Sequence, residues 1–509
     1  MKIKSRIIGL VLFIILSSCN SSENNNFKIT ITTAKEIAQD TKKQGRLFLF
    51  FTQNEGAEPR FQLFPDPVNA PLIYATNLSD FNATSDLILN QDEAWTSTVD
   101  YSFKDIPEGE YFVQALWDQD TLESGINAPG NIYSGKQKIN IKDGNSIDFQ
   151  LENIIPEQNL IKHELVKEIN FQSDTLSTWW NKSMTLKASI LLPSQYDKSK
   201  TYPIRYNVAG YGGRYTRVEN LIKDKDFMTW WNSDTSPQVI NVFLDGEGPF
   251  GDSYQMDSEN SGPYGYALIY ELIPHIENLY RGTTSVKTRF VDGCSTGGWV
   301  SLGLQLYYPE QFNGVFSYSP DAVEFENYQL INIYKDDNAY VNEFGYSRPC
   351  LRNVDGEPMV SMQKFVTFEN VLGRSNTYLD SGDQFGSHTA LYSPKGDDGL
   401  PKPLFDPISG DIDAEVAEHW KKYDFKLYAQ QNWESLGPKL QGKIYIWMGN
   451  MDHFYLNMAT RQFSEFLDTT QNPKSDAIIE FEPMAGHCSS YSHRKVLEQI
   501  QERLEKLNL

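Results

Sequence analysis

Hydrophobic and polar positions alternate in short runs through the first part of the chain, and turn residues separate these runs. Examples are residues 28–32, 46–51, 111–116 and 137–141. A period of two is typical of strands that bury one face, and many short strands between turns indicate an all-β sandwich. We therefore predict a β-sandwich domain over residues 27–156. It holds no cluster of catalytic residue types, so carbohydrate binding and a structural packing role both stay open.

After an expected linker over 157–185, the pattern changes to apolar runs of strand length that alternate with amphipathic stretches of helix length. We expect strands near residues 186–192, 204–209, 239–244, 289–292, 314–318, 443–448 and 477–481. Helices are expected near residues 266–280, 299–308, 455–467 and 494–506. Strands that alternate with helices predict βαβ units and a mostly parallel sheet. The predicted second domain therefore spans residues 186–509 and belongs to the α/β class.

The N-terminus has the pattern of a secretory signal. Three basic residues precede the apolar run 7–16, and small residues follow it. Its ending, Leu16-Ser17-Ser18-Cys19, resembles the lipobox of bacterial lipoproteins, in which the cysteine is lipidated and becomes the mature N-terminus. A plain secretory signal or a short membrane anchor is the alternative. No other apolar run approaches the roughly 18 residues that a membrane span needs.

The lipobox resemblance implies a signal peptide over 1–19, lipid on Cys19 and a polar tether over 20–26. We therefore expect the protein to be anchored by lipid in the bacterial cell envelope, at the outer membrane, facing the periplasm or the cell surface. The chain carries 45 Lys+Arg against 67 Asp+Glu, a net charge of −22. Such a balance argues against nucleic acid as a partner, since no basic stripe is present to neutralise phosphates.

A strand, a tight turn and a helix are predicted around Gly293-Cys294-Ser295-Thr296-Gly297. The spacing is the G-x-S-x-G of a nucleophile elbow. A serine on a sharp, strained turn needs neighbours without side chains, so that the backbone can pack closely behind it. An ordinary strand-to-helix turn is the alternative. We interpret Ser295 as a candidate nucleophile.

A serine hydroxyl needs a base, and the base needs an orienting acid. In α/β-hydrolases the chain order is Ser, acid, His. Asp452 follows the strand expected at 443–448 and is the candidate acid, with capping of the next helix as its alternative role. His487 lies in the loop beyond the last expected strand and is the candidate base. We expect His493 to open the final helix as a surface or capping residue.

The oxyanion hole requires backbone N–H groups directed at developing negative charge. Thr296, directly after the nucleophile, would supply one. The glycine-rich stretch 208–213 follows an earlier expected strand, so Tyr211 or Gly212 would supply the second. A simple tight turn is the alternative for that stretch. We expect no metal ion and no organic cofactor.

The cysteines sit beside the candidate catalytic residues. Cys294 precedes Ser295 and Cys488 follows His487, so a Ser–His hydrogen bond could bring the two thiols within disulfide range. The bridge would close a loop of about 195 residues, which is on the order of 5 kcal/mol in the chain-entropy model. Two buried free thiols are the alternative. Cys350 is left unpaired.

The stretch 322–442 interrupts the strand–helix pattern with mixed aromatic, acidic and Gly/Pro-rich sequence. An insertion of that size over the C-terminal edge of a sheet is commonly a lid or a substrate-binding cap. Its aspartates could hold calcium, but none matches the EF-hand spacing, which favours solvated loops. They are Asp380, Asp383, Asp397, Asp398, Asp406, Asp411 and Asp413.

From about residue 185 to 509 the chain resembles the putative esterase family, which includes enterochelin esterases, esterase D and many feruloyl esterases. The matching segments are 202–213, 271–277 and 293–298. The family often has His-Gly where this chain has Ala209-Gly210. Separately, Cys294-Ser295 with His487-Cys488 is similar to the paired motif of tannases and fungal-type feruloyl esterases, in which the two cysteines are bridged beside the triad.

These resemblances imply an α/β-hydrolase sheet with a cap insertion, preceded by the β-sandwich. The hypothesis is a serine esterase with Ser295, Asp452 and His487 as its triad, which forms an acyl-enzyme on an ester substrate. Acetyl or feruloyl groups on a glycan are the substrates that export and the β domain suggest. Two alternatives stay open: acyl transfer to an alcohol, and a lipid-anchored glycan-binding protein whose hydrolase-like half is inactive. The sequence does not specify the oligomeric state.

Overall fold

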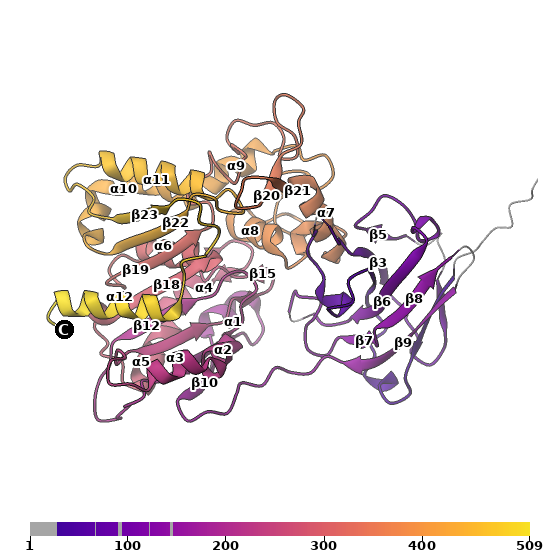
Figure 1. The fold of residues 1–509 in the computed structure, drawn as a ribbon, viewed down its shortest axis with the longest axis horizontal. Helices are drawn as coiled ribbons and strands as arrows, with labels where there is room; N and C mark the ends of the chain where they lie inside the picture. Colours follow the sequence, from indigo (N-terminus) through magenta and orange to yellow (C-terminus); the bar gives the residue numbers. More distant parts are fainter. Residues whose placement is uncertain (1–27, 67, 90–93, 122, 143–145) are drawn as a thin grey trace, which may run out of the picture.

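The computed structural model describes residues 28–66, 68–89, 94–121, 123–142 and 146–509. The expected signal peptide, with Cys19, and the tether lie outside these residues. Figure 1 shows an N-terminal all-β part on one side and a layered α/β part that ends at the C-terminus on the other. Within the described residues, no helix combines the length and apolar character that a bilayer crossing requires.

The described residues of the N-terminal part form one nine-stranded sheet in the order β4-β1-β9-β7-β6-β2-β3-β5, with β8 also paired to β6. The strands are β1 (Lys28–Thr33), β2 (Gly45–Thr52), β3 (Leu72–Leu78), β4 (Leu87–Leu89), β5 (Thr96–Ser97), β6 (Gly109–Asp118), β7 (Ile132–Ser134), β8 (Gln137–Ile141) and β9 (Ser146–Ile154). The all-β class is as predicted. Among the described residues the strands are hydrogen-bonded into one path, because β7 pairs with both β6 and β9 and so joins the two halves.

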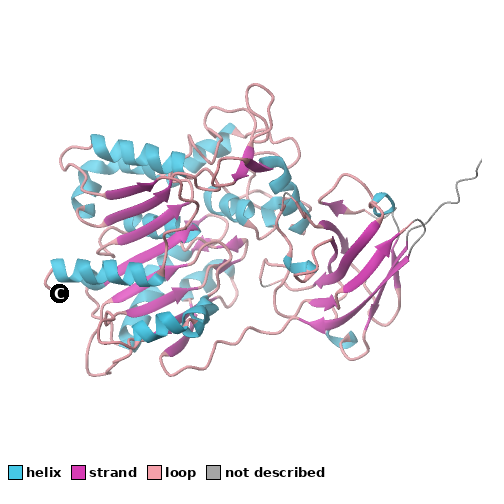
Figure 2. Cartoon of the chain, in the orientation of Figure 1, coloured by secondary structure: helices cyan, strands magenta, loops and turns pink. Residues whose placement is uncertain are grey.

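Side chains from both ends of this sheet share one core. Ile31 on β1, Leu49 on β2, Val113 on β6 and Phe149 on β9 are all fully buried in the same cluster. The sheet must therefore curve round (Figure 2), because its apolar side chains form one common core.

Strand β2 is buried on its other face as well. Phe48 and Phe50 point away from the inner core and pack against Phe368, Val371 and Leu372 of helix α7 (Met362–Leu372). This second face explains why residues 47–51 are apolar without interruption, whereas a half-exposed strand would alternate. The β part is thus packed onto the C-terminal half of the chain.

Two buried charges reinforce this contact. Arg46, 1% exposed, donates to the Val371 carbonyl oxygen over 2.9 Å. Asp118, 2% exposed, accepts from Arg374 over 2.9 Å. Burial raises the pKa of Asp118 to about 6, although the charge of Arg374 opposes the shift.

The described residues of the C-terminal part form an eight-stranded sheet in the order β10-β11-β13-β12-β18-β19-β22-β23. Its strands are β10 (Val166–Gln172), β11 (Thr185–Leu191), β12 (Ile204–Val208), β13 (Ile240–Leu244), β18 (Arg289–Ser295), β19 (Val315–Pro320), β22 (Ile444–Gly449) and β23 (Ile478–Glu482). The pairs β10–β11 and β11–β13 are antiparallel, and all later neighbours are parallel. The mostly parallel sheet of an α/β-hydrolase is therefore confirmed.

The segment 157–185 is not simply the linker that we expected. It contains β10, which pairs with β11 over its full length, and helix α1 (Asp174–Trp180). The alternation in β10 suits a strand at the edge of the sheet, where only one neighbour is available. The connection between the two parts is therefore shorter than predicted.

Helices cover both faces of the parallel sheet. On one face α2 (Val218–Lys223), α3 (Lys225–Trp231) and α12 (His493–Lys506) bury their apolar sides. The opposite face is covered by α4 (Tyr264–Ala267), α5 (Ile273–Tyr280), α6 (Thr296–Tyr307), α10 (Phe425–Leu440) and α11 (Asn457–Thr469). Phe290 and Val291, neighbours on β18, belong to the two different cores, as the period of a strand requires.

The insertion between β19 and β22 lies over one end of the sheet and carries α7 toward the β part (Figure 1). Its further elements are β20 (Pro349–Arg352), β21 (Pro358–Ser361), α8 (Gln384–Tyr392) and α9 (Ala414–Trp420). Helix α10, at its end, packs against α6 and α11 and so belongs to the layer that covers the sheet. Two pairs of two-residue strands complete the fold: β14 (Glu247–Gly248) pairs with β15 (Gly251–Asp252), and β16 (Asp257–Ser258) pairs with β17 (Gly262–Pro263).

Candidate active site

Ser295 lies on a strained turn at the end of β18, directly before α6. Its φ is 60°, a left-handed value that non-glycine residues seldom adopt. The neighbouring positions 293 and 297 must be glycine, because the backbone of residues 208–209 leaves no room for a Cβ there. A Cβ on Gly293 would lie 2.6 Å from the Val208 carbonyl oxygen, and one on Gly297 would lie 2.6 Å from the Ala209 carbonyl oxygen. The turn therefore has the geometry of a nucleophile elbow.

His487 and Asp452 form a hydrogen-bonded pair. The Nδ1–H of His487 donates to Asp452 Oδ2 over 2.6 Å. Asp452 is fully buried, and its other oxygen accepts from the backbone N–H groups of Phe454, at 2.9 Å, and Leu456, at 3.3 Å. The carboxylate of Asp452 thus caps the turn before the next helix and also binds His487. The two roles considered for Asp452, orienting acid and helix cap, therefore occur together. With Nδ1 protonated, the neutral ring keeps Nε2 as an acceptor.

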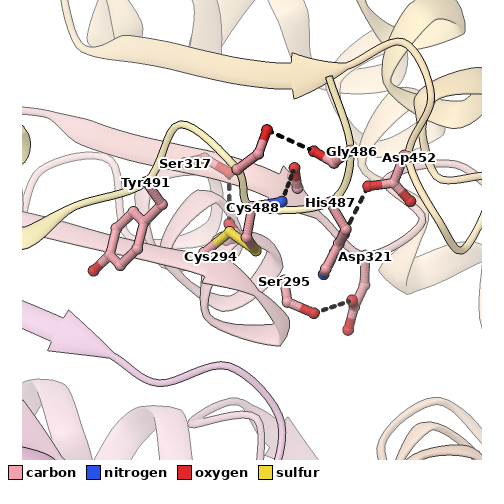
Figure 3. Close-up of a disulfide and its surroundings, with 12 residues drawn as sticks. Cys294, Ser295, Ser317, Asp321, Asp452, Gly486, His487, Cys488 and Tyr491 are labelled. Atoms are coloured by element: carbon pink, nitrogen blue, oxygen red, sulfur yellow. Dashed lines mark hydrogen bonds and ion pairs between the residues drawn. A yellow bond between two sulfur atoms is a disulfide. The ribbon is translucent and has the colours of Figure 1, made fainter. Parts of the chain in front are cut away.

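The electrostatics around His487 favour its charged form. Burial by itself lowers the pKa of this imidazole, but the charge and hydrogen bond of Asp452 and the charge of Asp321 outweigh burial. The net result is a pKa raised above the ordinary histidine value. In Figure 3 the ring of His487 lies between Asp452 and Ser295.

Cys294 and Cys488 are joined by a disulfide, with their Cα atoms 6.0 Å apart. The bridge links two positions 194 residues apart, and it lies next to the nucleophile and the histidine (Figure 3). Cys488 is also held by its backbone N–H, which donates to Ser319 Oγ over 3.1 Å. Cys350 is free and buried, and burial raises the pKa of its thiol to about 12.

Of the three expected oxyanion donors, Thr296 directly follows Ser295, and Tyr211 and Gly212 lie on a turn that begins next to it. Thr296 is the first residue of α6, so its N–H has no acceptor within the helix. The Gly213 N–H donates to the Gly210 carbonyl over 3.0 Å, and Gly212 has a φ of +70°, as in a type II turn with Tyr211 and Gly212 at its tip. A Cβ on Gly210 would lie 3.7 Å from Ser295 Cβ, so the turn is adjacent to the nucleophile.

A second carboxylate, Asp321, faces the nucleophile and was not among our candidates. Ser295 Oγ donates to Asp321 Oδ1 over 3.5 Å (Figure 3). Oδ2 of Asp321 accepts from Thr296 Oγ1 and Tyr254 OH, both at 3.0 Å, and contacts His388 Nε2 at 3.4 Å. Burial raises the pKa of Asp321, but the hydrogen bond and charge of His388, the charge of His487 and the Thr296 hydrogen bond hold it below the ordinary value.

A signal for Asp321 was present in the sequence. The residue directly follows β19, the strand next to the nucleophile strand, and parallel strands bring their carboxyl ends to one edge of the sheet. The partner His388 lies in the insertion on α8, far away in sequence, and nothing local connects it with the site.

His493 is the first residue of the last helix, as expected, but its side chain packs against other side chains and is not a surface group. Its ring packs against Phe243 and Tyr491, and its Nδ1 lies 3.1 Å from Arg205, which pairs with the buried Asp292 over 2.6 Å. Burial, together with the charges of Arg205 and Arg217, lowers its pKa well below the ordinary value. The cluster anchors the segment that follows His487 to the sheet.

The insertion supports the acid loop from outside. Arg352, at the end of β20, donates to the Asp452 carbonyl over 2.9 Å and to Asn457 Oδ1 over 3.0 Å.

As to metals, the described part of the chain contains no group of three or more His, Cys, Asp or Glu side chains arranged to hold an ion.

A family model described as "Putative esterase" matches residues 180–504. Among solved structures, a ferulic acid esterase is 14% identical over 67% of this chain and 97% of its own, with a TM-score of 0.43. An S-formylglutathione hydrolase from Agrobacterium tumefaciens is 13% identical over 67% and 93%, with a TM-score of 0.37. A ferulic acid esterase from Anaeromyces mucronatus, bound to ferulic acid, is 14% identical over 67% and 89%, with a TM-score of 0.31. No curated protein matches the sequence.

Proposed function

Because the chain belongs to the putative esterase family, we propose that it hydrolyses carboxylic esters with Ser295 as nucleophile, His487 as base and Asp452 as orienting acid. The observation that carries this assignment is the 2.6 Å hydrogen bond between His487 and Asp452, beside a serine on a strained elbow. The disulfide supports it, since it ties the neighbours of the serine and the histidine together.

In the proposed reaction, Ser295 Oγ attacks the ester carbonyl while His487 Nε2 takes the hydroxyl proton. Asp452 Oδ2 stabilises the imidazolium that forms. The backbone N–H groups of Thr296 and of Tyr211 or Gly212 would donate to the tetrahedral oxyanion. Collapse of the intermediate breaks the bond to the alcohol, which leaves with the proton from Nε2. Water then attacks the acyl-enzyme with the same base, which releases the acid and restores Ser295.

The experiment uses the chain without residues 1–19. A fluorophosphonate probe is added, the protein is digested and the labelled peptide is identified by mass spectrometry. We expect the label on Ser295, and loss of both label and ester turnover in Ser295→Ala. A folded wild-type protein that takes no label, or an alanine variant that keeps full turnover, would refute the assignment. Added acceptor alcohols would reveal acyl transfer as transesterified product.

We further propose that Cys19 is lipidated and that the protein is anchored in the cell envelope of a bacterium, at the outer membrane. The support is the Leu16-Ser17-Ser18-Cys19 sequence after the apolar run. Expression of the full chain with a radiolabelled fatty acid tests this. Label should enter the wild type but not Cys19→Ala, and membrane fractionation should find only the wild type with the outer membrane.

A further inference from the structure

A cavity of about 220 Å³ lies where the β part, the oxyanion turn and the insertion meet. The β6–β7 loop contributes Glu123, Gly125 and Asn127, among others, from the β part. The opposite wall contains the tip of the oxyanion turn, residues 211–214, and the β14–β15 hairpin. Gly382, in the insertion, closes the third side.

The β6–β7 loop is fixed in this position by direct contacts. Arg214, in the oxyanion loop, donates to both carboxylate oxygens of Glu123, over 2.9 and 3.1 Å. The backbone N–H and the hydroxyl of Ser124 each lie 3.3 Å from Glu247 Oε1. A Cβ on Gly382 would lie 2.5 Å from Ser124 Cβ, so the loop and the insertion are in close contact. The loop is therefore part of the wall and not a free surface loop.

The cavity and the nucleophile are linked by one β-turn, residues 210–213. Tyr211 and Gly212 line it, and they form the tip of the turn whose first residue, Gly210, is adjacent to Ser295. On the hairpin side, Asp252 accepts from the Tyr254 N–H over 2.9 Å, and Tyr254 OH donates to Asp321 next to Ser295. The oxyanion turn and the hairpin therefore connect the walls of the cavity with the surroundings of Ser295.

The lining suits a neutral ring that carries hydroxyl groups. Glu123, Glu247 and Asp252 offer carboxyl oxygens, which accept hydrogen bonds from hydroxyls. Arg214, the basic side chain on this wall, is already paired with Glu123 and Asp245. Several glycines leave bare backbone along the walls, so a ring can approach it closely. Among the described residues, the lining contains no further basic side chain that could pair with an anionic group.

The volume of the cavity and the protonation of its carboxyls also suit a neutral ring with hydroxyl groups. Pockets for drug-sized molecules are roughly 300–1,000 Å³, so a cavity of about 220 Å³ takes a single ring and not an extended chain. Burial is the main cause that raises the pKa of Glu247 to about 7 and that of Asp252 to about 8. At neutral pH these carboxyls can therefore donate to hydroxyls as well as accept from them.

We infer that the β6–β7 loop forms one wall of a subsite for a neutral sugar unit on the alcohol side of the ester. The inference rests on the proposed esterase function and names its substrate class. On this view the β part is neither a spacer nor an independent carbohydrate-binding module. It is a component of the active site that selects the alcohol of the substrate.

The test fills the cavity from the β part. Gly125 is exposed, lines the cavity and has no heavy atom within 4 Å of the position of an added Cβ, so Gly125→Phe introduces no backbone clash. The matched control is Gly56→Phe, an exposed glycine of the same part that does not line the cavity and whose added Cβ would meet only the amide end of Asn54. Two acetate esters are compared by pH-stat: ethyl acetate and a mono-O-acetylated methyl glucopyranoside.

We expect the ratio of kcat/KM for the sugar acetate to that for ethyl acetate to fall about tenfold or more in Gly125→Phe, because the phenyl ring occupies the space of the sugar. The control variant should leave both rate constants unchanged. An unchanged ratio in Gly125→Phe overturns the inference, whether both esters keep their rates or both lose them equally.

Binding without turnover separates this inference from the proposed function. In a Ser295→Ala background, calorimetric titration of the sugar acetate should show a dissociation constant about tenfold higher when Gly125→Phe is added. Equal affinities would refute the subsite even if the wild type is an active esterase. Failure of fluorophosphonate labelling in the wild type would refute the serine mechanism and leave the binding result standing.

Discussion

Cys294 and Cys488 form a disulfide whose two half-cystines are the direct chain neighbours of Ser295 and His487. The bridge therefore joins the elbow on β18 to the loop after β23, which are not neighbouring strands of the sheet. A covalent link at this place limits how far the histidine can move from the serine.

Removal of the bridge should lower both stability and turnover. We expect Cys294→Ala/Cys488→Ala to lose up to about 5 kcal/mol of unfolding free energy in the chain-entropy model, because the unfolded chain regains the freedom of a long loop. The rate constant kcat should fall as well, since the nucleophile and base are no longer held together. Denaturant unfolding and ester hydrolysis measure the two effects. Cys350→Ala, a buried free thiol away from the bridge, is the control, and equal kcat values in wild type and double variant would contradict the positioning role.

The pH dependence of kcat/KM should reflect the raised pKa of His487. The base must be neutral to accept the serine proton, so kcat/KM rises as the imidazolium loses its proton. Because the pKa is raised, the midpoint of this rise should lie above the ordinary value of about 6.5.

Asp452→Asn tests the cause of this shift. Removal of the carboxylate charge leaves burial as the main influence on His487, so the midpoint should move to lower pH. Turnover should fall by about 10⁴-fold, because the amide no longer holds the productive tautomer. His163→Gln, at a half-buried histidine in the segment before β10, serves as the control and should change neither quantity. A midpoint that stays in place in Asp452→Asn would mean that this carboxylate does not act on the base.

Asp321→Asn should also move the midpoint to lower pH, since the charge of Asp321 contributes to the raised pKa of His487. An asparagine keeps one oxygen as an acceptor for Thr296 and Tyr254, so the fold should survive. We expect a smaller loss of kcat than in Asp452→Asn, because the hydrogen bond between His487 and Asp452 is intact in Asp321→Asn. A purely structural role would lower the melting temperature without moving the pH profile, and that result would contradict an electrostatic role.

The contact between the β part and the insertion should depend on pH in Arg374→Ala. Asp118 has a pKa of about 6 in the folded protein against 3.8 as its ordinary value, so folding loses stability as the pH rises through this window. Arg374 offsets part of that loss. Without it the folded pKa rises further, and the drop in melting temperature should be larger at pH 8 than at pH 5.

The control for this effect is Lys43→Ala, which breaks an ion pair with Asp80 whose side chains are 75% and 82% exposed. Exposed pairs contribute little, so this variant should show no difference between the two pH values. Equal drops for Arg374→Ala at pH 5 and pH 8 would show that Asp118 does not depend on that arginine for its charge.

Local pattern and chain order were sufficient for much of the architecture. Strand–helix alternation predicted seven of the eight strands of the parallel sheet, because apolar runs of strand length between amphipathic helices have few other structures available. The spacing of glycines around Ser295 indicated the elbow, since the close approach there is a property of adjacent residues. Order along the chain selected Asp452 and His487, and the structure places them in contact.

Other features depend on which surfaces meet. β10 was not predicted because a half-exposed edge strand has a weak apolar signal. The sheet of the β part depends on the pairing of β1 with β9, which lie far apart in the chain. Asp321 gains its surroundings only when β19 lies beside β18 and α8 of the insertion brings His388 to it.

The cavity beside the oxyanion turn is the clearest case of tertiary control. Glu123, Arg214 and Gly382 lie far apart in the chain, and no periodicity relates them. Secondary structure follows from interactions between near neighbours, which the order of residues specifies directly. The position of the β6–β7 loop follows instead from the packing of α7 on the outer face of β2 and from the ion pair between Glu123 and Arg214, contacts that exist only after both parts have folded.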